Sequence, residues 1–220
     1  MTSLRGKCGI IWILKLLPHF LFSVVVKFGK NIYNLCIQKD AQEKNIMNNN
    51  LKILITEEDI HAEIKKAGKK ISALYDGRPI LLVSILKGSF IFLADLCREI
   101  DVPCEISFMC AKSYVGTESK GKVDITMDIE QDISKYHVVI VEDIVDTGRT
   151  LKEISAILKS RNPLSFNVVT LLDKPERRVV DFEADISLFT IKDLFVVGYG
   201  LDCDEKYRNL KYVAEYISDW

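Results

Sequence analysis

The sequence has no excess of charge of either sign. Its 220 residues carry 30 lysines and arginines against 31 aspartates and glutamates, which gives a formal net charge of −1 at pH 7. A global basic field, which favours binding to nucleic acid, is therefore missing. We expect no nucleic-acid partner, and any site for an anion must depend on local geometry.

The sequence also lacks the paired cysteines of zinc and redox motifs. Its six cysteines form no Cys-x-x-Cys pair, and several lie in apolar runs, as Cys110 does in Ser107-Phe-Met-Cys-Ala111. Such cysteines are typical of reduced thiols in a reducing compartment. We therefore expect a cytoplasmic protein.

No clean membrane-spanning run is present near the N-terminus. The most apolar stretch, residues 8–29, is interrupted by Lys15, Pro18, His19 and Lys27, and no tidy small-residue cleavage site follows it. We expect residues 1–50, apolar and then polar, to be an extension outside the catalytic unit, with Met47 as a plausible natural start. Two alternatives stay open: a membrane-associating or targeting segment, whose membrane contact would run through residues 8–29, and a packed structural element.

The remaining residues, 51–220, predict one α/β domain without internal repeats. A chain of this length that is 48% hydrophobic can bury one substantial core. Helical spacing of apolar residues begins at the cap Thr56 and ends at Asp76-Gly-Arg-Pro79. The other expected elements are strands at 79–86, 105–111, 138–141, 166–172 and 186–190, helices at 90–99 and after 150, and an antiparallel flap strand at 123–127.

The stretch from His137 to Thr150 carries the most chemical information. Val138 to Val141 form a β-branched run, as expected of a central strand in a parallel sheet. Glu142 and Asp143 follow, and we expect them at the carboxyl end of that strand, which faces the ligand crevice in open α/β sheets. Two carboxylates there are well placed for a metal ion or for sugar hydroxyls.

A hydroxyl-rich turn, Asp146-Thr-Gly-Arg-Thr150, then leads into an apolar-periodic helix. Gly148 permits tight backbone geometry, and Thr147 and Thr150 supply hydroxyls. The helix start adds free amides and the positive end of its dipole. Taken singly, such a turn is often only a helix cap, but the whole unit predicts an anion cradle.

The ordered combination of acid pair, third acid and turn resembles the signature of the type I phosphoribosyltransferases. In that family the loop holds the 5′-phosphate of phosphoribosyl pyrophosphate, and the acid pair lies along its ribose. The resemblance covers roughly Leu51 to Ile217.

Four further segments resemble the hypoxanthine-guanine branch of this family. Leu86-Lys-Gly-Ser89 is similar to its pyrophosphate loop, where the bond before the lysine is a non-proline cis peptide. Ser113-Tyr-Val-Gly116 opens a stretch similar to its mobile lid. Leu171-Leu-Asp-Lys-Pro175 resembles the strand end whose lysine contacts the purine 6-oxygen. Phe195 to Asp202, with Arg208 after it, resembles the base-stacking and metal-side loop.

The resemblance implies a fold and a reaction. The expected fold is α/β, a Rossmann-like parallel sheet flanked by helices, with a small hood and a flexible lid. The expected reaction is purine salvage: transfer of the 5-phosphoribosyl group from phosphoribosyl pyrophosphate to a 6-oxopurine, hypoxanthine or guanine, which gives IMP or GMP and pyrophosphate. A homodimer or homotetramer is also expected.

Residue roles follow from the same resemblance. Asp146 is the expected catalytic residue, an acid that accepts the proton of purine N7; the alternative is that it only caps the loop. The groups expected to bind phosphoribosyl pyrophosphate and its phosphates are Lys87, Gly88, Ser113, Tyr114, Glu142, Asp143, Asp146, Thr147, Gly148, Arg149, Thr150 and Arg208. The purine groups are Lys174, Phe195, Val196 and Asp202. Mg²⁺ is the expected cofactor, and its ligands are Glu142, Asp143 and Asp202.

Two other functions stay open. An enzyme of the same fold could prefer xanthine, because Lys174 donates to any 6-oxo group and disfavours only adenine, whose exocyclic amine is itself a donor. A regulator could keep the fold as a metabolite-binding module. Parallel assays with hypoxanthine, guanine, xanthine and adenine separate these possibilities.

Overall fold

The computed structural model describes residues 50–113 and 123–217. Its contacts divide the chain into two units, Met1–Asn50 and Leu51–Trp220, and the structure below is that of the second unit. The expectations for the N-terminal extension and for Tyr114 fall outside the described residues, as does the side chain of Ser113.

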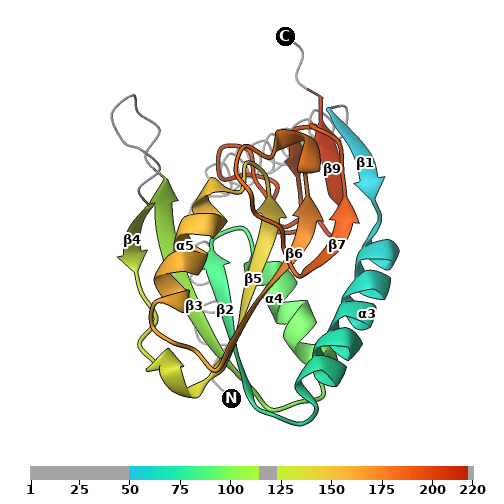
Figure 1. Cartoon of the computed structure of the whole chain (residues 1–220). Helices are drawn as coiled ribbons and strands as arrows, with labels where there is room; N and C mark the ends of the chain where they lie inside the picture. Colours follow the sequence, from blue (N-terminus) through green and yellow to red (C-terminus); the bar gives the residue numbers. More distant parts are fainter. Residues whose placement is uncertain (1–49, 114–122, 218–220) are drawn as a thin grey trace, which may run out of the picture. The chain divides into compact units, whose positions relative to one another are not determined.

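A six-stranded sheet forms the centre of this unit, in the order β4-β3-β2-β5-β6-β7 (Figure 1). All neighbours are parallel except β3 and β4. The strands are β2 (Ile80–Leu86), β3 (Cys104–Ser113), β4 (Val123–Met127), β5 (His137–Val145), β6 (Ser165–Asp173) and β7 (Ile186–Thr190). This arrangement confirms the predicted α/β class, including the antiparallel flap strand.

Helices cover both faces of the sheet. α3 (Glu57–Tyr75) begins at Thr56, whose Oγ1 accepts a hydrogen bond from the Asp59 amide at 3.2 Å, and ends at Asp76 in the left-handed region. α4 (Phe90–Leu96), extended by the short helix η1 (Cys97–Glu99), lies with α3 on one face, and α5 (Arg149–Lys159) lies on the other. Two further short helices, η2 (Ile133–Lys135) and η3 (Pro175–Arg177), lie in connections.

Alternate residues of the central strands pack into two hydrophobic clusters, one on each face of the sheet. In β2, Leu82 packs in the cluster that contains Ile64 of α3, whereas Leu81 packs in the cluster that contains Ile154 of α5. All these side chains are buried. Because side chains alternate across a strand, a continuous apolar run is required when both faces are covered.

A second, antiparallel sheet joins the ends of the domain. It consists of β1 (Leu51–Ile55), β9 (Val213–Tyr216) and β8 (Val196–Val197), in that order. It corresponds to the small hood that the resemblance predicts. It carries Val196 and lies directly beside the Phe195 segment.

The strand β5 is longer than predicted. We expected a strand at 138–141 with Glu142 and Asp143 at its carboxyl end, but the strand continues to Val145. The reason is the neighbouring strand β6. Glu142 pairs with Thr170 and Val145 with Asp173, so the pairing of β5 with β6 continues beyond the apolar residues of β5. The acids therefore lie on a rigid strand rather than on a loop.

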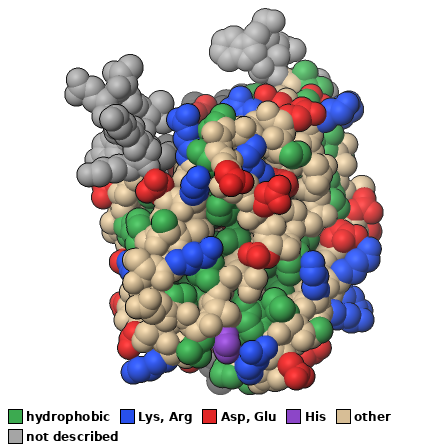
Figure 2. Space-filling view, viewed as in Figure 1, with side chains coloured by type: hydrophobic (Ala, Val, Ile, Leu, Met, Phe, Trp, Pro, Cys, Tyr) green, Lys and Arg blue, Asp and Glu red, His purple; other side chains and the backbone are tan. Residues whose placement is uncertain are grey.

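The surface of the described residues carries mixed charge. On the face shown in Figure 2, basic and acidic side chains are interspersed. The described cysteines, at 97, 104, 110 and 203, are free thiols. Within residues 50–113 and 123–217, no helix is long and apolar enough to span a bilayer.

Candidate active site

The turn between β5 and α5 forms a small open cavity. Gly148 has φ 79° and occupies the N-cap position of α5. A Cβ at Gly148 would lie 2.9 Å from Cδ of Arg178, so both conformation and space require glycine. The cavity, about 130 Å³, is lined by Glu142 and by residues of the turn and the first helical turn. Its size suits a phosphate group at a helix N-terminus.

The structure does not place Asp146 as a helix cap. Gly148 holds the cap position without a side-chain bond, and the amide of Arg149 donates to Thr147 Oγ1 at 3.5 Å. The Asp146 carboxylate instead accepts from Nε of Arg177 at 3.0 Å. Arg149 and Thr150, which we expected in the turn, form the first turn of α5.

Glu142 and Asp143 are unusually basic carboxylates. Burial raises the pKa of Glu142 well above its ordinary range, and the neighbouring Asp143 raises it further. Burial likewise raises the pKa of Asp143 to about 6, while its own backbone contacts and Arg208 oppose the shift. Oε2 of Glu142 is buried and has no hydrogen-bond partner. Such a pair is poised to receive a cation or donor groups.

The raised pKa of Asp143 predicts how stability depends on pH. A raised folded-state pKa means that the folded protein binds the proton more tightly, so this contribution is full below pH 3.8, the ordinary value, and is lost as pH rises to about 6. Asp143→Asn should remove that loss and raise the free energy of unfolding of the ligand-free protein at pH 7 by on the order of 1 kcal/mol. Urea unfolding of both proteins between pH 4 and 7 measures this. Parallel pH profiles for the two proteins would contradict it.

The Lys87 loop packs against these acids. The Leu86-Lys87 peptide bond is cis, as the resemblance implies. A Cβ on Gly88 would overlap the Asp143 carboxylate, so the loop approaches the acid as closely as glycine allows. Lys87 is exposed, and its Nζ donates to Glu205 at 3.0 Å.

Arg208 and Asp202 form an ion pair beside the Lys87 loop. Nη2 of Arg208 lies 2.8 Å from Asp202 Oδ1 and 3.4 Å from Glu205 Oε2, and its Nη1 donates to the carbonyl of Gly200. Its Nε is buried without a partner. Arg208 is thus held in place and is not a freely solvated charge. Glu205 contacts both Lys87 and Arg208, the two cations that we expect to bind pyrophosphate.

The expected purine side is built from the end of β6 and the segment before β8. Lys174 is buried, its Nζ donates to the carbonyl of Leu194 at 2.6 Å, and its amide donates to the carbonyl of Val145 at 2.9 Å. Phe195 is 56% exposed and meets Tyr216 edge to face, so it is not a core aromatic. Val196, the next residue, is buried. A flat, accessible ring next to a buried cation can receive a heteroaromatic base.

Sequence reasoning missed three residues around these groups. Arg177 and Arg178 contact Asp146, and Glu205 contacts Lys87 and Arg208. The basic pair after Asp173-Lys-Pro175 and the acid after Asp202 were visible in the sequence. Nothing local, however, indicated what they touch.

The acid pair fits a divalent cation in part. Two adjacent carboxylates, one with an unpaired buried oxygen, are ligands that Mg²⁺ accepts when waters and substrate oxygens complete its shell. Both oxygens of Asp202 are engaged, by Arg208 and by the Glu205 amide. Among the described residues no group of three His, Cys, Asp or Glu side chains could hold a metal by itself.

Comparisons with known proteins agree with this geometry. Residues 54–204 match the profile of the phosphoribosyl transferase domain. The fold and the loop therefore define a phosphoribosyltransferase. Hypoxanthine-guanine phosphoribosyltransferases of Staphylococcus aureus and Streptococcus pneumoniae are 49% and 48% identical to the chain, over 76% and 74% of it and 95% and 91% of their own lengths.

A solved structure resembles this chain both in sequence and in fold. The crystal structure of a hypoxanthine phosphoribosyltransferase from Staphylococcus aureus superposes with a TM-score of 0.75 and 47% identity, over 78% of this chain and 94% of that one. This chain belongs to the hypoxanthine-guanine phosphoribosyltransferase family of purine salvage.

Proposed function

We propose that this chain transfers the phosphoribosyl group to hypoxanthine or guanine through Glu142, Asp143 and Asp146, with Lys174 and Phe195 binding the base. The observation that carries the proposal is the meeting of three segments at one edge of the sheet. The Asp146–Gly148 turn follows the acid-bearing strand β5, and the Lys174 amide bonds to the last residue of that strand. Lys174 in turn holds Leu194, the neighbour of Phe195.

The reaction demands opposite charges on its two sides. When the bond between the anomeric carbon and pyrophosphate breaks, positive charge builds on the ribose and negative charge on the leaving group. Glu142 and Asp143 stabilise the ribose side, and Lys87 and Arg208 bind the pyrophosphate. Glu142 and Asp143 would hold Mg²⁺, and Asp202 would join them in exchange for one of its present contacts with Arg208 and the Glu205 amide. When bound, Mg²⁺ would neutralise charge on the pyrophosphate.

The base requires a donor and an acceptor. Lys174 donates to the purine 6-oxygen, and the Asp146 carboxylate accepts the N7 proton while N9 forms the new bond to the anomeric carbon. Thr147, Gly148, Arg149 and Thr150 hold the 5′-phosphate. Ser113 and Tyr114, whose side chains lie outside the described residues, are assigned by the family resemblance to a lid that would exclude water.

Parallel assays of pyrophosphate release test the proposal. Hypoxanthine and guanine should turn over, and adenine should be a poor substrate. Preferential use of xanthine would favour the same-fold alternative, and tight binding of nucleotide without turnover of any base would favour a regulatory module.

The extension is proposed to lie outside the catalytic unit. A variant that starts at Met47 and lacks residues 1–46 should stay folded and keep kcat within about 2-fold, since the family match begins at residue 54. Thermal unfolding and steady-state assays of both forms check this. Loss of the folded domain would contradict it, and pelleting with membranes of the full chain alone would favour the targeting alternative.

We place the chain in the cytoplasm as a homodimer or homotetramer. The partly exposed apolar side chains Ile106 and Phe108 of β3 and Met127 of β4 offer a surface for such contacts. Light scattering of the purified chain measures its mass.

A further inference from the structure

Two neighbouring arginines bind Asp146, one at its side-chain carboxylate and the other at its backbone carbonyl. Nε of Arg177 donates to the Asp146 carboxylate at 3.0 Å, and Nη1 of Arg178 donates to the Asp146 carbonyl at 2.5 Å. Both arginines follow β6, more than 30 residues away in the chain. The side chain and the backbone of one residue of the turn are thus controlled separately.

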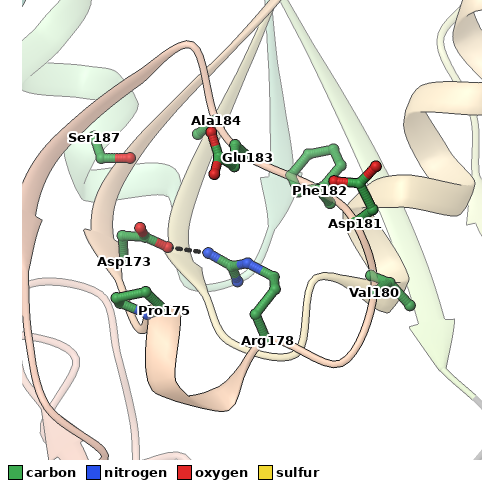
Figure 3. A pocket seen from close by; sticks show the side chains of 9 residues that line it. All are labelled: Asp173, Pro175, Arg178, Val180, Asp181, Phe182, Glu183, Ala184 and Ser187. Atoms are coloured by element: carbon green, nitrogen blue, oxygen red, sulfur yellow. Dashed lines mark hydrogen bonds and ion pairs between the residues drawn. The ribbon is translucent and has the colours of Figure 1, made fainter.

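Arg178 stabilises the backbone of the Asp146–Gly148 turn. Its side chain is only 14% exposed, its Nη2 pairs with the carboxylate of Asp173, and its Cδ lies where a side chain on Gly148 would be. The amide of Val179 adds a bond to the carbonyl of Thr147 at 3.2 Å. Figure 3 shows Arg178 reaching to Asp173 within an open cavity of about 490 Å³. The guanidinium and its bonds therefore help to fix the turn, together with apolar side chains that pack near Gly148.

Arg177 joins the turn to the purine-facing segment. It is about half-exposed, and besides Asp146 it approaches a second carboxylate, Asp193, whose Oδ2 lies 3.6 Å from its Nη1. Asp193 directly precedes Leu194, whose carbonyl accepts from Lys174, and then Phe195. One cation therefore links the proton acceptor to the segment that carries the stacking ring.

We propose that the two arginines are positioning residues with separable effects: Arg178 sets affinity for phosphoribosyl pyrophosphate through the turn backbone, and Arg177 sets affinity for the purine through the Asp146 carboxylate. The inference rests on the proposed function. In this proposal neither guanidinium takes part in bond making, because their hydrogen bonds and ion pairs are made to Asp146, Asp173 and Asp193.

Steady-state kinetics of two glutamine variants test the separation. Arg178→Gln removes a largely buried charged donor, so the KM for phosphoribosyl pyrophosphate should rise on the order of 10-fold, with little change in the KM for hypoxanthine. Arg177→Gln removes an exposed ion pair, so the KM for hypoxanthine should rise about 2- to 5-fold at unchanged KM for phosphoribosyl pyrophosphate. Arg177→Lys keeps the charge and should restore most of that loss.

The control is an arginine–aspartate pair far from the turn. Arg161 lies 2.7 Å from Asp128, and Arg161→Gln should leave both KM values unchanged per folded molecule. If Arg178→Gln does not fold, Arg178→Lys takes its place, and its KM for phosphoribosyl pyrophosphate should still rise. Unchanged KM values, or equal changes for both substrates, would overturn the inference. A wild-type chain that turns over no purine would instead refute the proposed function.

Discussion

Replacing Asp146 with asparagine should lower kcat for hypoxanthine by about 100- to 10,000-fold, the usual contribution of general acid–base catalysis. Asparagine has the same size and keeps an acceptor for Arg177, while the bond from Arg178 reaches the backbone and is unaffected. Folding and phosphate binding should therefore persist. The variant loses only the carboxylate that accepts the N7 proton.

The kinetic measurement separates this role from a structural one. Asp193→Asn is the matched control, because Asp193 pairs with the same Arg177 and should change kcat little. The low-pH limb of the rate profile should also change its steepness in the Asp146 variant. An unchanged kcat with a raised KM for phosphoribosyl pyrophosphate would contradict the role of Asp146 as the proton acceptor and would show that it serves only in the phosphate-binding loop.

The parts of the fold that the sequence predicted are those with local causes. The helix α3 follows from the Thr56 cap and apolar spacing, and β7 from its short apolar run; both have the expected bounds to within a residue or two. The Gly148 turn was also predictable, because few residues tolerate φ 79°. The hydrophobic clusters then follow from alternation along β2.

Features set by a distant partner could not be predicted in the same way. The acids at 142 and 143 read as the end of a strand, but pairing with β6 carries β5 to Val145. Glu205 contacts Lys87 from 118 residues away, and no pattern around either residue indicates it. The same holds for the arginines that hold Asp146. The order of the motifs follows the family resemblance, whereas the ion pairs between them form only when the chain folds.

Replacing Lys174 with alanine should reduce turnover of hypoxanthine and guanine by on the order of 10- to 1,000-fold. Lys174 is buried and uses one of its three donors on the carbonyl of Leu194, which leaves donors for the purine 6-oxygen. Loss of one charged hydrogen bond costs roughly 1.5–3 kcal/mol, or about 10- to 150-fold. The freed Leu194 adds a further loss, because it no longer holds the neighbouring Phe195 in place.

The measurement that decides the Lys174 assignment is discrimination among bases. In Lys174→Ala, the ratio of kcat/KM for hypoxanthine to that for adenine should fall, because only the 6-oxo group uses the lost donor. The KM for phosphoribosyl pyrophosphate should change little. Lys192→Ala is the control, since Lys192 is an exposed lysine in the connection from β7 to β8, close to Phe195 in the sequence. A Lys174 variant that still discriminates as the wild type does would show that the purine lies elsewhere, and the pairing of Lys174 with Leu194 would then serve only to hold the β6 connection.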